Sequence, residues 1–189
     1  RPDYKLSSMD RLNVVMFNRD GEKYNILDKE VENTIRLVTR FPNVHLIVKE
    51  HPRYNLIDPS SQITDIPNLE IKRDEVQSVS LVDWGDVFLE LGTTIAFEPI
   101  MRGKPVLSLP YTHSNYPTVS HYLSGSDMRC KDDLYYTLHD IMDEGCSDFY
   151  DEEERERFIQ EMITSGHDSV LDAHADFIES CLGVNEEEA

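Results

Sequence analysis

Two polar clusters in the sequence carry residue types that could bind a ligand, and the first comprises Gly92, Thr93, Thr94 and Glu98. A glycine lets the backbone approach a ligand closely, and the start of a helix offers free N–H groups at its positive end. Two threonine hydroxyls add donors, and this combination suits a phosphate. Glu98 could accept hydrogen bonds from ribose hydroxyls. The structural alternative is that Thr93 or Thr94 caps the helix and Glu98 pairs with Arg102.

The second cluster is His51 with Lys49 and Arg53 on either side. Pro52 favours an extended backbone at His51, which would project the imidazole ring beyond an apolar segment. A histidine there could donate to a phosphate or contact a base, and a local basic cluster is unusual in an acidic chain. Arg19, which follows an earlier apolar segment, is a further candidate. The alternatives are a structural or exposed histidine and an arginine on a surface loop.

Short apolar runs that alternate with helical patterns must position these residues. We expect strands near 12–17, 44–48, 69–71, 86–90 and 106–109, and helices near 28–41, 75–82, 92–103, 132–143, 151–164 and 168–182. This alternation predicts one α/β domain with a parallel sheet and a helical C-terminus. Ligands of such sheets bind beyond the carboxyl ends of the strands, which is where both clusters fall.

The charge of the chain excludes one class of protein. Its 189 residues carry a formal net charge of −19, and a general nucleic-acid binder needs a basic surface instead. Residues 140–189 hold 17 acidic residues against two arginines, which we interpret as a solvated helical face and an acidic end. No apolar run is long enough to cross a membrane, and no N-terminal signal peptide is recognisable.

Several familiar sites have no support in the sequence. Three cysteines form no C-x-x-C motif, and the histidines form no ligand pair at zinc spacing, so we expect no metal site. The motifs of dinucleotide-binding proteins, P-loop NTPases, α/β-hydrolases and zinc proteases are missing from the chain. The cysteine usage suits a reducing compartment. We therefore expect a cytoplasmic protein, at most peripheral to the inner face of the membrane.

Four segments in fixed order resemble one known family. They are VKEHPR at residues 48–53, WGDV at 84–87, GTTIAFE at 92–98 and GKPV at 103–106. The set is similar to the C-terminal, nucleotide-binding half of GT-B glycosyltransferases. Within these it most resembles capsule and surface-polysaccharide transferases of the Kdo transferase or CDP-glycerol glycerophosphotransferase type. The resemblance implies a Rossmann-like three-layer domain over residues 1–183, followed by an acidic tail at 184–189.

The resemblance also implies roles for the candidate residues. In the family, the His-Pro dipeptide contacts a cytidine nucleotide, which corresponds to His51 here. The hydroxyl pair that holds the donor phosphate corresponds to Thr93 and Thr94, and the ribose-binding carboxylate corresponds to Glu98. The expected substrate is a CMP- or CDP-linked sugar, with no separate cofactor. Pro99 departs from the pattern, because a small or apolar residue is expected there.

Expected partners follow from the two-domain architecture of the family. The acceptor, a saccharide or a lipid-linked molecule, and the catalytic base belong to an N-terminal GT-B domain. The chain starts at Arg1 and holds one domain, so we interpret it as an excised half or as a subunit that needs a partner. The catalytic residues are therefore unknown. The helix near 168–182 could brace the other domain through an apolar face, or pack on its own domain.

Two other hypotheses remain open at this point. One is a GT-B protein that uses a UDP-sugar, or a domain similar to UDP-GlcNAc 2-epimerase, which would prefer uridine nucleotides. The other is a non-catalytic α/β module whose acidic helices bind a basic partner, which would have no affinity for nucleotides.

Overall fold

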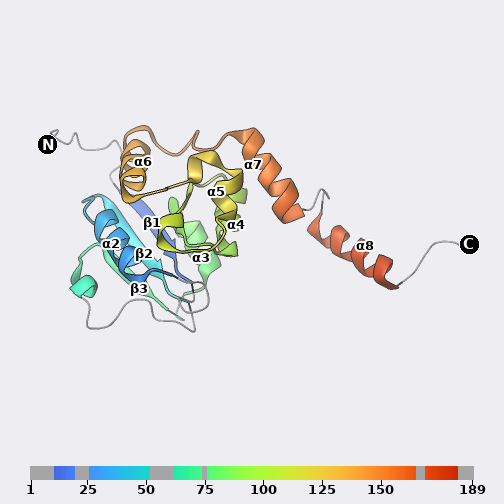
Figure 1. Cartoon of the computed structure of the whole chain (residues 1–189), viewed down its shortest axis with the longest axis horizontal. Helices are drawn as coiled ribbons and strands as arrows, with labels where there is room; N and C mark the ends of the chain where they lie inside the picture. The colour runs from blue at the N-terminus through green and yellow to red at the C-terminus, as the bar shows by residue number, and fades with distance from the viewer. Residues whose placement is uncertain (1–10, 20–25, 52–61, 74–75, 165–168, 183–189) are drawn as a thin grey trace, which may run out of the picture.

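The computed structural model describes residues 11–19, 26–51, 62–73, 76–164 and 169–182. Its centre is one parallel sheet in the order β3-β2-β1-β4-β5. The strands are β1 (Leu12–Phe17), β2 (Val44–Lys49), β3 (Leu69–Lys72), β4 (Val87–Glu90) and β5 (Val106–Ser108). Figure 1 shows the sheet wrapped by helices. The parallel α/β architecture expected from the alternating pattern is confirmed.

Helices cover both faces of the sheet. On one face, apolar side chains of the strands pack against α2 (Asp28–Val38) and α6 (Lys131–Glu144). On the other face they pack against α3 (Ser78–Trp84), α4 (Phe97–Met101), α5 (Thr118–Tyr122) and α7 (Glu152–Ile159). Short 3-10 turns complete the domain: η1 (Gln62–Asp65), η2 (Thr94–Ala96), η3 (Pro110–Thr112) and η4 (Ser124–Ser126). The result is a three-layer arrangement.

The central strand β1 explains why the strands are so apolar. Val14 and Met16 of β1 belong to the α2/α6 face, whereas Val15 and Phe17 belong to the opposite face, and all four are buried. Successive strand residues point to opposite sides of a sheet, so a strand covered on both faces reads as a continuous apolar run. The Phe17 ring stacks on the ring of Phe88 from β4, with centroids 5.9 Å apart.

One helix differs from the expected one for local reasons. The helix expected over 92–103 begins only at Thr94 as the 3-10 turn η2 and becomes α-helical at Phe97. Gly92 has φ +78°, which a helix cannot contain. Pro99 is buried in α4 without breaking it, because the first turn of a helix does not need the N–H that proline lacks.

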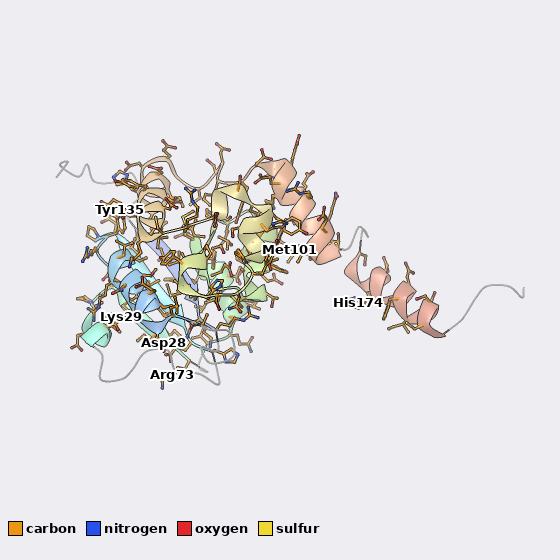
Figure 2. All side chains as sticks on the ribbon, in the orientation of Figure 1. Asp28, Lys29, Arg73, Met101, Tyr135 and His174 are labelled. Carbon is orange, nitrogen blue, oxygen red and sulfur yellow. The ribbon has the colours of Figure 1, made fainter. Side chains whose placement is uncertain are left out.

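The C-terminal helices pack less and less on the domain along the chain. Helix α7 continues as the π-helical turn η5 (Gln160–Thr164), and α8 (Val170–Leu182) follows. In Figure 1, α8 projects away from the sheet, and in Figure 2 its side chains, His174 among them, stand clear of the core. Leu171, Phe177 and Ile178 are exposed. In the described segments, every helix is too short or too polar to cross a membrane.

Candidate functional site

The strand order defines one special place along the carboxyl edge of the sheet. From β1 the chain moves outward to β2 and β3, then returns to the other side of β1 with β4. The reversal therefore lies between β1 and β4, and open α/β sheets bind ligands at such a switch point. Asn18 and Arg19 leave β1 here, and Gly92 and Thr93 follow β4. We call this group, together with Glu90 and His113, the Gly92 site.

Gly92 is required at this position for two reasons. Its φ of +78° lies in the left-handed region that side chains with a Cβ rarely adopt. A Cβ at Gly92 would also lie 3.2 Å from Nη1 of Arg19 and 3.8 Å from Nε2 of His113. The missing side chain thus lets an arginine and a histidine approach the same point of the backbone.

A buried carboxylate holds the loop that contains Gly92. Glu90 is 1% exposed and accepts hydrogen bonds from Ser108 Oγ at 2.5 Å, from the Thr93 N–H at 3.0 Å and from the Gly92 N–H. Burial raises the pKa of Glu90, while these three donors and the charge of Arg19 act in the opposite direction. Glu90 therefore occupies the N–H groups of both Gly92 and Thr93.

His113 presents an unsatisfied hydrogen-bond donor to the site. Its Nδ1 accepts from the N–H of Asn115 at 3.2 Å, so the proton of the neutral ring is on Nε2. That Nε2 is buried and has no hydrogen-bond partner among the described residues. Burial and the charge of Arg19 lower the pKa of His113, so the ring stays neutral near pH 7.

Asn18 supplies a second unsatisfied donor at the same edge. Its Oδ1 accepts from the N–H of Arg19 at 2.7 Å, which leaves its Nδ2 amide group to point elsewhere. This Nδ2 is buried without a hydrogen-bond partner in the described part of the chain. Buried polar groups are rarely left unpaired in folded proteins. Since both unpaired groups donate, and Arg19 adds a positive charge, the complement that they require is an acceptor or an anion.

The second polar cluster lies at the end of β2, one strand away from Asn18. Lys49 is buried, and its Nζ donates to the backbone carbonyls of Glu50 and Arg73. The carboxylate of Glu50 accepts from Nε of Arg73 at 2.6 Å. Lys49 therefore contacts the backbone where a ligand contact was expected. His51 follows directly and is half-buried; Arg53 lies outside the described residues.

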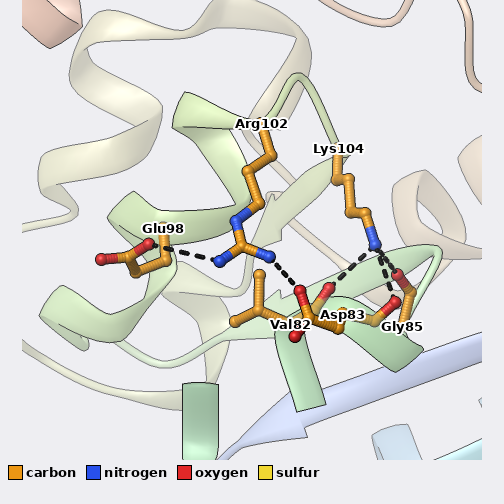
Figure 3. Close-up of polar contacts among 6 residues, drawn as sticks. All are labelled: Val82, Asp83, Gly85, Glu98, Arg102 and Lys104. Carbon is orange, nitrogen blue, oxygen red and sulfur yellow. Dashed lines mark hydrogen bonds and ion pairs between the residues drawn. The ribbon is translucent and has the colours of Figure 1, made fainter. Parts of the chain in front are cut away.

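Glu98 pairs with Arg102, which is the structural alternative to a ribose-binding role (Figure 3). Its Oε2 lies 3.9 Å from Nη2 of Arg102, and the same guanidinium forms an ion pair with Asp83. Lys104 Nζ donates to the carbonyls of Val82 and Gly85, both at 2.8 Å. These contacts tie α4 to the end of α3. The pair between Glu98 and Arg102 is partly exposed, so breaking it would cost at most about 1 kcal/mol.

The structure thus brings together Arg19, Gly92 and Thr93 from the predicted set, with Thr94 next in the chain. It adds three residues to which the sequence analysis gave no ligand-binding role: Asn18, Glu90 and His113. One pattern could have indicated Glu90, because a carboxylate directly after the apolar run Val87–Leu89 is unusual in a buried strand. Nothing comparable marks His113. No group of three or more potential metal ligands is found among the described residues.

The sheet order and the helices on both faces define a Rossmann-like α/β fold, and it matches the folds of GT-B glycosyltransferases. No model of a known protein family matches the chain, and no curated protein matches its sequence. The glycotransferase of kitacinnamycin is similar at TM-score 0.58 and 16% identity, over 95% of this chain and 45% of that one.

Two further solved structures are similar to the chain. UDP-GlcNAc 2-epimerase from Neisseria meningitidis, bound to UDP-GlcNAc, is similar at TM-score 0.53 and 15% identity, over 82% of this chain and 45% of its own. The β-Kdo 2,4 transferase KpsC of Thermosulfurimonas dismutans reaches TM-score 0.39 and 20% identity, over 52% and 34%. That score is too low to support one type of transferase. The chain spans less than half the length of each of these three proteins.

Proposed function

We propose that this chain is the donor-binding half of a glycosyltransferase that uses a nucleotide-activated sugar in capsule or surface polysaccharide synthesis. A cytidine nucleotide is the favoured donor, because the VKEHPR and GTTIAFE segments resemble those of cytidine-dependent transferases. An N-terminal GT-B domain would supply the acceptor site and the catalytic base. Alone, the chain binds nucleotide without turnover.

One observation carries this proposal. At the switch point of the sheet, the unpaired donors His113 Nε2 and Asn18 Nδ2 are buried on the same edge as the Arg19 guanidinium. A nucleotide phosphate would supply acceptor oxygens to the two unpaired donors and place its negative charge beside the Arg19 guanidinium. Charge-assisted hydrogen bonds of this kind are about twice as strong as neutral ones.

The remaining predicted residues take roles around that phosphate. The hydroxyls of Thr93 and Thr94 donate to phosphate oxygens. Glu98 exchanges its weak pair with Arg102 for the ribose hydroxyls, at the small cost given above. His51, at the end of β2, contacts the base. During transfer, an acceptor hydroxyl oxygen forms a bond to the anomeric carbon and gives its proton to the base of the N-terminal domain, while the bond between the anomeric carbon and the phosphate oxygen breaks. The fixed donors stabilise the charge that develops on the departing phosphate.

A uridine-dependent protein is the second candidate. The observation in its favour is the similarity of fold to the Neisseria meningitidis epimerase bound to UDP-GlcNAc, at TM-score 0.53. The same site would then hold the phosphates of a UDP-sugar. The two candidates differ in the base that they select.

The test is a calorimetric titration of the chain with CMP, CDP, UMP and UDP. We expect cytidine-selective binding, loss of that selectivity in His51→Ala, and about 10- to 100-fold weaker binding in His113→Ala. His174→Ala, on the exposed helix α8, is the matched control and should bind as the wild type does. Thermal unfolding of each variant checks that it is folded.

Each other outcome selects a different conclusion. A preference for UMP and UDP would favour the uridine-dependent candidate. Unchanged affinity in His113→Ala would remove the Gly92 site from the proposal. No binding of any nucleotide, combined with salt-sensitive binding to a basic protein, would favour the non-catalytic module.

A further inference from the structure

A cavity lies beside the end of β5, at the edge of the sheet. It has a volume of about 460 Å³ and opens to solvent between η3, α5 and the segment after η4. Small-molecule sites in proteins typically measure roughly 300–1,000 Å³. Its lining includes aromatic, hydroxyl and charged side chains: Tyr111, Tyr116, Ser120, His121, Asp127 and Arg129.

The inner wall of this cavity is fixed by contacts to the rest of the domain. The Tyr111 hydroxyl shares a hydrogen bond of 2.8 Å with Oγ1 of Thr34 on α2. Burial raises the pKa of Tyr111 to about 12, so the phenol stays protonated near neutral pH. The backbone at Asp127 forms a parallel bridge to Ser108 of β5, which anchors the opposite side. The cavity is therefore a preformed feature of the fold.

The mouth of the cavity exposes aromatic surface. Tyr116 is 65% exposed, and its ring centroid lies 5.4 Å from that of His121, with the two planes tilted by 54°. The apolar C–H face of a saccharide ring can pack on the exposed face of Tyr116.

The polar groups at the cavity match the hydroxyl groups of a saccharide. The Asp127 carboxylate only accepts hydrogen bonds, the Arg129 guanidinium only donates, and the Ser120 hydroxyl does both. Sugar hydroxyls likewise donate and accept. Asp127 and Arg129 carry opposite charges, and Nε of Arg129 already lies 3.3 Å from Oδ2 of Asp133, so the lining offers no excess of positive charge to an anionic ligand.

We propose that this cavity binds a neutral saccharide, at a site separate from the Gly92 site. Tyr116 and His121 contact the C–H faces of the sugar, and Asp127 and Arg129 contact its hydroxyls. The segment from Tyr111 to His113 forms part of both sites, so a saccharide bound here lies on the same edge of the sheet as a ligand of the Gly92 site. The proposal does not depend on which nucleotide, if any, that other site binds.

The test is saturation-transfer NMR on the full chain with three neutral disaccharides: maltose, lactose and N,N′-diacetylchitobiose. We expect transfer to the ring protons of at least one of them, and loss of most of that transfer in Tyr116→Ala. Tyr136→Ala is the matched control, because Tyr136 is also 65% exposed but lies on α6, outside the cavity. Asp127→Asn, which keeps the shape of the side chain, should also reduce the transfer.

Three results would overturn the proposal. They are no transfer to any disaccharide, equal transfer in Tyr116→Ala and wild type, and displacement of the disaccharide by free cytidine or uridine. Nucleotide titration of Tyr116→Ala separates the two sites. Wild-type nucleotide affinity with lost saccharide transfer supports a separate saccharide site. Nucleotide binding without any saccharide transfer overturns this proposal and leaves the donor-binding function standing.

Discussion

Gly92→Ala separates backbone strain from ligand binding, because the chain has matched glycines elsewhere. Gly92, Gly103 and Gly145 have φ values of +78°, +70° and +90°. An L-residue held in the left-handed region costs roughly 1–2 kcal/mol. We expect alanine at Gly92 and Gly103 to lower the free energy of unfolding by about that amount. Gly145 has φ +90° and ψ −171°, a combination that is essentially restricted to glycine, so alanine there should cost at least as much. In a domain of this size, the melting temperature would fall by about 2–8 °C.

The three positions differ in what the new Cβ meets. At Gly92 it would lie 3.2 Å from Nη1 of Arg19, so the guanidinium has to shift. At Gly103 the nearest atom is 3.9 Å away on Arg155, and at Gly145 there is nothing within 4 Å. Only Gly92→Ala therefore displaces a donor of the Gly92 site. A lost hydrogen bond to a charged group costs about 1.5–3 kcal/mol, or about 10- to 100-fold in affinity.

The assay pairs thermal unfolding with calorimetric titration of the nucleotide that the wild type binds. The expected result is destabilisation of all three variants and weaker binding by Gly92→Ala alone. Wild-type affinity in Gly92→Ala would refute the assignment of the nucleotide to this edge. An equal loss of affinity in all three variants would mean that strain, and not the position of Arg19, controls binding.

Two further predictions concern stability. Because the pKa of Glu90 is raised in the folded state, the folded protein holds the Glu90 proton more tightly than the unfolded chain does. The stabilisation of the folded state that results is complete below the ordinary pKa of 4.5 and is lost as the pH rises through the raised pKa. Urea denaturation from about pH 4 to pH 8 should therefore show a wild-type minus Glu90→Gln difference that changes with pH, and a constant difference would contradict this. Phe158, fully buried against the rings of Phe97 and Tyr122, should cost about 3–5 kcal/mol when changed to alanine in the same assay. The exposed Phe177→Ala is its control, and a loss below about 1 kcal/mol in Phe158→Ala would mean that α7 does not pack on α4 and α5.

The strands were predictable because both faces of the sheet are covered. Each predicted strand falls on an observed one, since a buried parallel strand needs an apolar run that stands out against polar loops. The ends of helices were harder to predict. The helix expected over 28–41 ends at Val38, and the turn that follows buries Phe41 against α6, where its ring stacks on Tyr135 at 5.1 Å. Helix α5 has only five residues, too few to show a period.

Sequence reasoning could predict only those site residues that directly follow a strand, because the strand order alone places them. Arg19 and Gly92 follow adjacent strands, so topology alone places them together. Glu90 depends on register, because β4 and β5 pair so that Glu90 is opposite Ser108. His113 depends on tertiary hydrogen bonds that return η3 toward the start of α2, such as Leu27 N–H to Thr112 O at 2.7 Å. No local pattern records such contacts.

The strand order also has a consequence for synthesis on the ribosome. Strand β1 is made first but lies at the centre of the sheet, between β2 and β4. Its second edge stays open until Val87, 75 residues after Leu12, has been made. At about 5–20 residues per second, that interval is roughly 4–15 s. Throughout it, the nascent chain carries an apolar strand with an unpaired edge, which is the kind of segment that ribosome-associated chaperones protect from aggregation.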